Sequence, residues 1–201
     1  MLYQIDAVLP LIMTAVFFLL MMGALIIIYK IRYKKVPPGK AMIVYGKGTE
    51  PHGSIIVIRG GKFIIPIVQG YDFIPLETWS SVVEAKRIPT GSDPDKGVDL
   101  KLSLRYGIGD EEKDLRSAAG HFVRKEDEEV HRFIEETLTL HTLDVARDVF
   151  RKRPLDQLAD DRSSAGEIIR RGVQNKVGFM GVKIRSLTIE KMDILDRMAR
   201  S

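Results

Sequence analysis

The chain has 201 residues, no cysteine and a formal net charge of +4, and charged residues make up 29% of it. The absence of cysteine excludes disulfides, thiolate metal sites, a cysteine nucleophile and palmitoyl anchoring. Acidic and basic residues are interspersed through most of the sequence, as on an ordinary solvated surface, so nucleic acid is not an expected partner.

An uncharged apolar segment lies near the start of the chain. It covers 23 residues, 7–29, between Asp6 and Lys30, and a helix of that length spans roughly 34 Å, enough to cross a bilayer core. Its apolar residues surround the helix on all sides, which argues against an interfacial amphipathic helix. The rival interpretation is a cleavable signal peptide, which needs a basic leader, a shorter apolar run and a small-residue cleavage site, and this segment has none of them. We therefore predict a single transmembrane anchor.

Basic residues follow this segment and none precedes it. Those just after it are Lys30, Arg32, Lys34, Lys35 and Lys40. The positive-inside rule then keeps the rest of the chain on the cytoplasmic side of a cell membrane. We expect the first four of these residues to form a basic collar that faces anionic lipid headgroups, at very roughly 1 kcal/mol per residue near the surface. Residues 1–35 are thus predicted to be the anchor and its collar.

The remainder is the right size for one domain, predicted over residues 36–192. It begins with a stiff Val-Pro-Pro-Gly linker at residues 36–39, because each proline fixes its own φ and pushes its predecessor to extended geometry. Short β-type runs separated by turn residues follow. They predict strands over residues 41–45, 55–58, 63–67, 71–76, 82–87 and 98–108. The last strand alternates apolar and polar residues, which predicts one buried and one solvated face.

From Asp110 the apolar period changes to that of a helix. Helices are predicted over residues 111–119, 126–150 and about 154–178, and a closing strand over 182–189. The middle helix has an apolar stripe made by Val130, Phe133, Ile134, Leu138, Val145 and Val149. Strands followed by helices and a final strand, without a repeating βαβ unit, indicate an α+β fold.

Several segments are similar to a known family. They are VPPGKAMIVYGKG at residues 36–48, GGKFIIPIVQGYDFIPLE at 60–77, FIEETLTLH at 133–141, PLDQLADDR at 154–162 and GFMGVKIRSLTIEKM at 178–192. Together and in this order they resemble the SPFH (band 7, or stomatin-prohibitin-flotillin) domain, and within that family they resemble flotillin-like proteins most. Flotillins continue into a long coiled coil, so we expect residues 193–201 to be the start of a truncated or short C-terminal helix.

The resemblance also carries expectations about function. It implies a non-catalytic membrane protein without cofactor or metal, and a homo-oligomer that gathers client membrane proteins. It places Asp161 and Arg162 on a helix available to neighbouring subunits, where an intersubunit ion pair is one interpretation and an intrahelical contact is the default.

Candidate catalytic groups are few. His131 and Glu135 are spaced i, i+4 on one helix face but have no third ligand nearby in sequence, so a metal site is not expected. His141 falls near the apolar stripe and is interpreted as a packing residue rather than a proton switch. A Ser/Lys dyad would draw on a serine such as those at positions 54, 80, 81 and 103, but nothing around these serines resembles a nucleophile elbow.

Two further segments have alternative interpretations. Gly46-Lys47-Gly48 resembles a phosphate loop only superficially, and we predict a hairpin turn there. The isoleucines at positions 64, 65 and 67 either dip into the headgroup layer or belong to the core, and the core is the ordinary expectation.

Three functional hypotheses follow. The first is a flotillin-like membrane scaffold that assembles laterally and organises membrane microdomains. The second is a regulatory subunit that restrains a membrane protease or transporter. The third, from a different class, is a membrane-tethered hydrolase with a Ser/Lys dyad.

Overall fold

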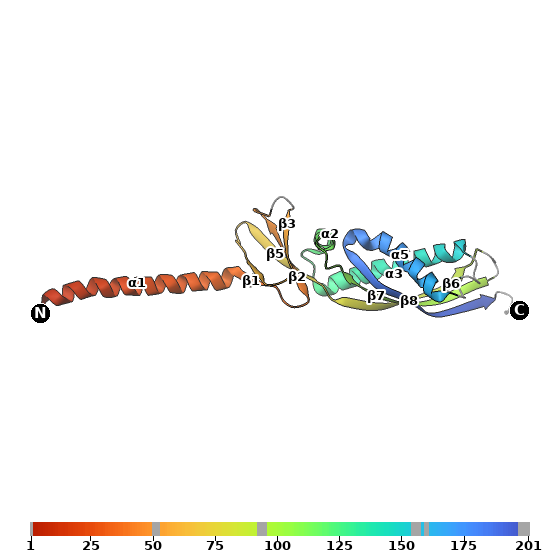
Figure 1. Cartoon of the computed structure of the whole chain (residues 1–201), viewed down its shortest axis with the longest axis horizontal. Helices are drawn as coiled ribbons and strands as arrows, with labels where there is room; N and C mark the ends of the chain where they lie inside the picture. The colour runs from red at the N-terminus through yellow and green to blue at the C-terminus, as the bar shows by residue number, and fades with distance from the viewer. Residues whose placement is uncertain (1, 50–52, 92–95, 154–157, 159–160, 197–201) are drawn as a thin grey trace.

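The computed structural model describes residues 2–49, 53–91, 96–153, 158 and 161–196. A long N-terminal helix projects from one end of an elongated chain, and the last strand ends at the other (Figure 1). In chain order the elements are α1 (Leu2–Arg32), β1 (Tyr33–Lys35), β2 (Lys40–Gly46), β3 (Ser54–Val57), β4 (Gly61–Phe63), β5 (Gln69–Pro75), β6 (Thr78–Pro89), β7 (Lys96–Ile108), α2 (Glu112–Phe122), α3 (Asp127–Lys152), α5 (Arg162–Val177), the 3-10 turn η1 (Gly178–Met180) and β8 (Val182–Asp196).

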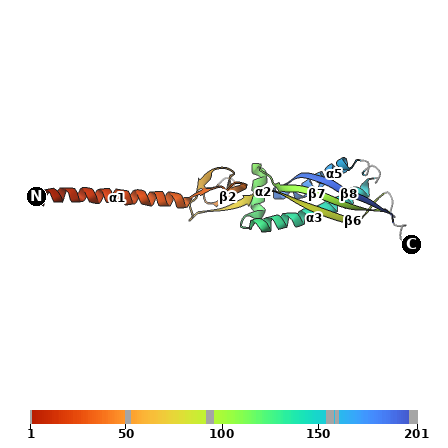
Figure 2. The same cartoon turned by 90° about the horizontal axis from the view of Figure 1, so that it is seen from below.

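The strands form three antiparallel groups: the β1-β4 pair, a sheet in the order β3-β2-β5, and a sheet in the order β6-β7-β8. The β1-β4 pair and the β2 sheet lie beside the end of α1, and the long β7 sheet lies further along the chain (Figure 1). Helix α2 stands between the two regions, roughly across the long axis (Figure 2). Strands, then helices, then a closing strand confirm the predicted α+β fold.

The β2 hairpin turns at Gly46, as predicted for the Gly46-Lys47-Gly48 segment. Gly46 has φ +115°, and a Cβ there would lie 2.2 Å from the carbonyl oxygen of Val68, so both the conformation and the close approach require glycine. Met42 and Val44 of β2 pack with Ile64 in a small core beneath this sheet.

Strand β7 confirms the predicted alternation. Val98, Leu100, Leu102, Leu104 and Tyr106 are all buried, and α3 and α5 lie side by side over that face of the sheet (Figure 1). The opposite face carries Asp99, Lys101, Ser103 and Arg105, and no element in the described part of the chain covers it. Burying one face and solvating the other is what a period of two produces in an antiparallel sheet.

Helix α3 buries most of its predicted apolar stripe against this sheet. Val130, Ile134 and Leu138 are at most 1% exposed. Phe133 is the exception: it is 40% exposed, its ring meets the Phe122 ring edge-on at 6.1 Å, and the Lys125 ammonium lies 4.8 Å above it.

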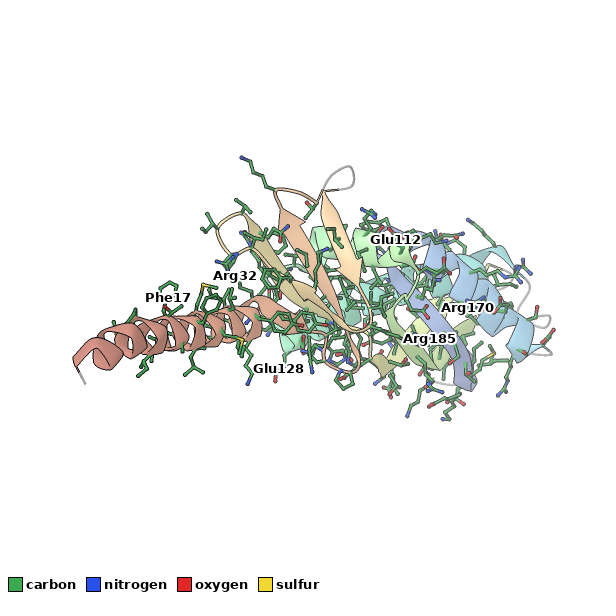
Figure 3. The ribbon with its side chains drawn as sticks, turned by 60° about the vertical axis from the view of Figure 1, so that its left-hand side comes forward. Phe17, Arg32, Glu112, Glu128, Arg170 and Arg185 are labelled. Carbon is green, nitrogen blue, oxygen red and sulfur yellow. The ribbon has the colours of Figure 1, made fainter. Side chains whose placement is uncertain are left out.

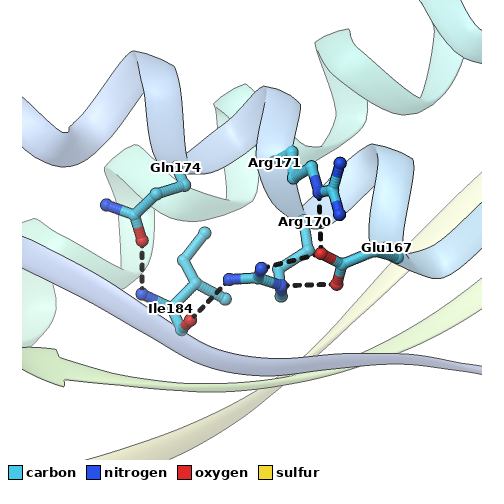
Figure 4. A network of polar contacts seen from close by, with 5 residues as sticks. All are labelled: Glu167, Arg170, Arg171, Gln174 and Ile184. Atoms are coloured by element: carbon cyan, nitrogen blue, oxygen red, sulfur yellow. Dashed lines mark hydrogen bonds and ion pairs between the residues drawn. The ribbon is translucent and has the colours of Figure 1, made fainter.

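Helix α5 covers the first part of the open edge of β8. The Gln174 side-chain amide donates to the Val182 carbonyl at 2.9 Å, as a neighbouring strand would. It also accepts from the Ile184 N–H at 2.8 Å (Figure 4). The Arg170 guanidinium donates to the Ile184 carbonyl at 3.3 Å. Unpaired strand edges invite association, and a covering helix is one of the ways in which proteins prevent it.

Three sequence predictions differ from the structure. The strand predicted over residues 63–67 ends at Phe63, because Pro66 lacks an N–H for a ladder and the chain turns from Ile65 to Val68. The helix predicted from Asp193 is wrong at its start, since β8 continues to Asp196 by pairing with β7. The helix predicted over about 154–178 is interrupted at Asp161, just before α5 begins at Arg162; Leu158 is helical, and residues 154–157, 159–160 and 197–201 lie outside the described residues.

Candidate functional site

The junction between α1 and the domain is held by aromatic rings. Tyr29, in the last turns of α1, stacks on Tyr33 of β1 with ring centroids 5.5 Å apart, and lies 6.4 Å from the ring of Phe63 in β4. The Ile64 N–H donates to the carbonyl of Arg32, the last helical residue, at 2.9 Å. Helix and strand therefore follow one another directly, and Figure 3 shows Arg32 where α1 meets the first strands. The predicted stiff linker at residues 36–39 comes after this junction, not before it.

Gly61 allows β4 to approach β1 closely enough for this arrangement. A Cβ at Gly61 would lie 2.5 Å from the Lys34 carbonyl oxygen and 2.8 Å from the Tyr33 ring. The β1-β4 pair thus fixes Tyr33, and through it the end of α1, against the domain.

The predicted collar divides between two elements. Lys30 and Arg32 are in the last turn of α1, whereas Lys34 and Lys35 are in β1. The Lys34 ammonium lies 5.7 Å from the centre of the Tyr71 ring, and Lys30 and Lys35 are exposed. Pairing places Lys62 of β4 opposite Lys34, which adds a cation that sequence order did not indicate.

Lys40, which also follows the apolar segment, has another role. Its ammonium forms an ion pair with Asp127 at the start of α3. Nearby, the Asp72 carboxylate of β5 accepts from the backbone N–H of Arg124, whose φ is +69°. These contacts tie the small sheet to the helices, so the domain continues as one packed body from the junction onward.

The three isoleucines considered for the headgroup layer separate into two groups. Ile64 is 3% exposed and belongs to the small core, whereas Ile65 is 43% and Ile67 89% exposed. The core interpretation is correct for Ile64 and wrong for the other two.

A charged cleft lies between α2, α5 and β8. It is open to solvent, has a volume of about 650 Å³ and is lined by Lys113, Asp114, Arg170 and Lys183 among others. Lys183 donates a hydrogen bond to the Glu111 carboxylate at 2.5 Å and forms an ion pair with Asp114 at 2.9 Å, and these two carboxylates raise its pKa. The three cations that line the cleft, Lys113, Arg170 and Lys183, are each paired with a carboxylate of the same chain. The described lining therefore offers no unpaired positive charge to attract an anion.

A family model described as the SPFH domain / Band 7 family matches residues 34–201. The chain belongs to this family. No curated protein matches it. The match begins inside β1, so the element that receives α1 is part of the SPFH domain. The family indicates a membrane-associated scaffold or regulatory protein and is generally not enzymatic. In α1, the segment Ile12–Arg32 is long and apolar enough to cross a membrane.

In this SPFH domain Asp161 caps the N-terminus of α5. Its carboxylate accepts from the Ser164 N–H at 2.9 Å. Arg162 is the first helical residue and is exposed. Asp161 thus makes a contact within the helix, as expected by default, but this contact is a cap and not an ion pair. An ion pair of Asp161 or Arg162 with a neighbouring subunit stays a prediction.

The candidate metal ligand His131 packs between α3 and the β7 sheet. His131 packs on the Trp79 ring, with centroids 5.0 Å apart, and its Nε2 lies 3.3 Å from the Tyr106 hydroxyl. His131 is therefore part of the interface between α3 and the sheet rather than a plain surface neighbour of Glu135. Within the described ranges no group of three acidic or histidine side chains could hold a metal ion.

The serines considered for a hydrolase are not arranged as dyads. Ser81 is buried with its hydroxyl beside that of Tyr106 rather than beside a lysine. His141 is half-buried on α3, consistent with a packing role.

Proposed function

We propose that this protein is a flotillin-like scaffold that spans the cell membrane once, keeps its SPFH domain in the cytoplasm and assembles side by side with further copies. The single observation that carries the proposal is the direct passage from α1 to β1, held by the Tyr29–Tyr33 ring stack. A helix joined in this way passes its orientation in the bilayer on to the domain. Copies that share one orientation in a plane meet through the same lateral faces each time.

Confinement to a membrane favours such assembly. It raises the effective concentration of the copies, so contacts that are individually weak add together. The collar of Lys30, Arg32, Lys34 and Lys35, extended by Lys62, favours an anionic leaflet. Assembled copies would then concentrate client membrane proteins and anionic lipids around them.

Particle size and symmetry of the full chain test this proposal. The protein is reconstituted in lipid nanodiscs or extracted with native lipid, and its mass distribution is measured at membrane-like density. We expect discrete multimers with a repeating subunit contact. Only monomers under these conditions would contradict lateral assembly.

The same sample separates the scaffold from a regulatory subunit. A regulatory subunit of a protease or transporter copurifies with one dominant partner, and loses it when the domain surface is mutated but not when α1 is exchanged for another span. A scaffold copurifies mainly with itself. A protease-protection assay on a tag placed after Ser201 reports the side of the membrane, and a tag found outside intact cells would contradict the cytoplasmic orientation.

A further inference from the structure

The turn between β4 and β5 presents apolar side chains to solvent next to the anchor. Phe63, Ile65, Ile67 and Val68 are 43%, 43%, 89% and 39% exposed. Among the side chains that the structure describes, no other large hydrophobic one is as exposed as Ile67, and the greatest value in the described part of α1 is 70%, at Leu19. An apolar side chain directed outward to this degree is unfavourable in water.

The turn keeps much of its backbone satisfied by itself. The N–H groups of Val68 and Gln69 donate to the Ile65 carbonyl at 3.1 and 2.8 Å, and the Val68 carbonyl accepts from the Lys47 N–H at 2.9 Å. The Gln69 side-chain carbonyl accepts from the Ile65 N–H at 3.2 Å, and Pro66 has no N–H to satisfy. Internally bonded backbone is the condition for leaving bulk water without a large desolvation cost.

The position of the turn relates it to the apolar surface of α1. The Ile64 N–H donates to the Arg32 carbonyl, and the Phe63 ring lies near the Tyr29 ring, so the turn begins where the anchor ends. Lys62 lies in β4 just before the turn and pairs with Lys34 of the collar. Apolar side chains next to cations are the composition of segments that lie at the interface of an anionic membrane.

We propose that the Ile65–Val68 turn inserts into the boundary between headgroups and acyl chains of the membrane that α1 spans. It forms a second contact beside the axis of α1. A lone helix can tilt in many directions, whereas two contacts on a rigid body select one tilt. The domain then presents the same lateral face at the same height in every copy. This inference rests on the proposed membrane anchorage of α1.

The absence of cysteine makes the test direct. Single variants Ile67→Cys, Leu19→Cys and Ile194→Cys of the full chain are labelled with a polarity-sensitive fluorophore and reconstituted in vesicles of phosphatidylcholine and phosphatidylglycerol. Ile194 is the matched control: it is 50% exposed and lies near the end of β8, away from α1 (Figure 1). Quenching by nitroxide-labelled lipids, with the nitroxide near the headgroup or deep in the acyl chain, reports depth.

We expect the label at position 19 to be quenched by the deep nitroxide, the label at 67 by the shallow one, and the label at 194 by neither. Emission from position 67 should also shift to the blue on reconstitution. If position 19 is quenched and position 67 behaves like 194, the second contact is wrong and the anchor stands. If position 19 is not quenched, the anchorage itself is wrong.

Discussion

The hydroxyl of Tyr106 and Nε2 of His131 lie 3.3 Å apart, and together they join β7 to α3 in the interior of the domain. Trp79 packs against both rings, with centroids 6.1 Å from Tyr106 and 5.0 Å from His131. Burial, together with the charge of Glu135, raises the pKa of Tyr106 from 10.0 to about 12. The phenol is thus held in its neutral form.

Tyr106→Phe removes the hydroxyl and leaves the imidazole nitrogen without this partner. We expect a loss of about 1 kcal/mol in the free energy of unfolding at neutral pH. A raised pKa in the folded state gives stability that is complete below pH 10.0 and is lost as the pH rises through about 12. Denaturant unfolding should therefore show the difference between wild type and variant shrinking over that window; a constant difference would contradict the buried, protonated phenol.

The surroundings of Glu167 predict a loss of folding stability at low pH. Hydrogen bonds from Arg170, and next from Arg171, lower its pKa to about 2. A lowered pKa in the folded state contributes stability that is present above pH 4.5 and is lost as the pH falls towards about 2. The melting temperature of the wild type should thus fall more steeply over this pH range than the melting temperature of Glu167→Gln. Because the pair is exposed, the difference should be small and should shrink in about 1 M salt, where the Debye length is roughly 3 Å.

Gln174 tests whether α5 closes the edge of β8. Gln174→Leu removes both hydrogen bonds to Val182 and Ile184, and we expect a cost of about 1–3 kcal/mol and self-association through the exposed edge. Gln174→Glu keeps an acceptor for the Ile184 N–H but loses the donor to Val182, so its cost should be intermediate. Asn175→Leu, at the neighbouring exposed position, is the control and should change stability little. Equal effects at both positions would contradict the role of Gln174 in covering the edge of β8.

Gly181 and Gly39 separate conformational strain from close approach. Both have a left-handed φ, +75° and +74°, but a Cβ at Gly181 would lie 2.0 Å from the Asp114 carbonyl oxygen, whereas nothing lies within 4 Å at Gly39. Gly39→Ala should cost roughly 1–2 kcal/mol from backbone strain alone. Gly181→Ala must also displace α2, so its unfolding free energy should fall by clearly more, and similar losses would indicate that α2 yields easily.

Local patterns predicted the parts of the fold that depend on neighbouring residues. The alternation in β7 and the three-four spacing on α3 indicate one buried face each, and the structure confirms both. The apolar run at residues 63–67 does not form one strand, and hydrophobicity alone does not distinguish a core strand from an exposed turn. Pro66 was the local signal against a regular strand.

Contacts between distant residues were not predictable from these patterns. Lys62 joins the collar only because β4 pairs with β1. His131 meets Tyr106 across 25 positions, so its spacing to Glu135 gave no indication of its surroundings. The cap at Asp161 had a local signal, since aspartate before a helix commonly accepts from the N–H three residues later, but the expected helix start at Pro154 obscured it.

Asp161 and Arg162 allow the cap and the proposed intersubunit contact to be tested separately. Asp161→Ala removes the acceptor for the Ser164 N–H and should cost about 1 kcal/mol, whereas Asp161→Asn keeps a side-chain oxygen in place and should unfold like the wild type. Arg162→Ala should leave the unfolding free energy nearly unchanged because the side chain is exposed. If the pair joins neighbouring subunits, Asp161→Asn and Arg162→Ala both reduce the mass of the reconstituted assembly without lowering the stability of the domain. An unchanged mass for both variants would restrict Asp161 to its cap and direct the search for the lateral contact to other faces.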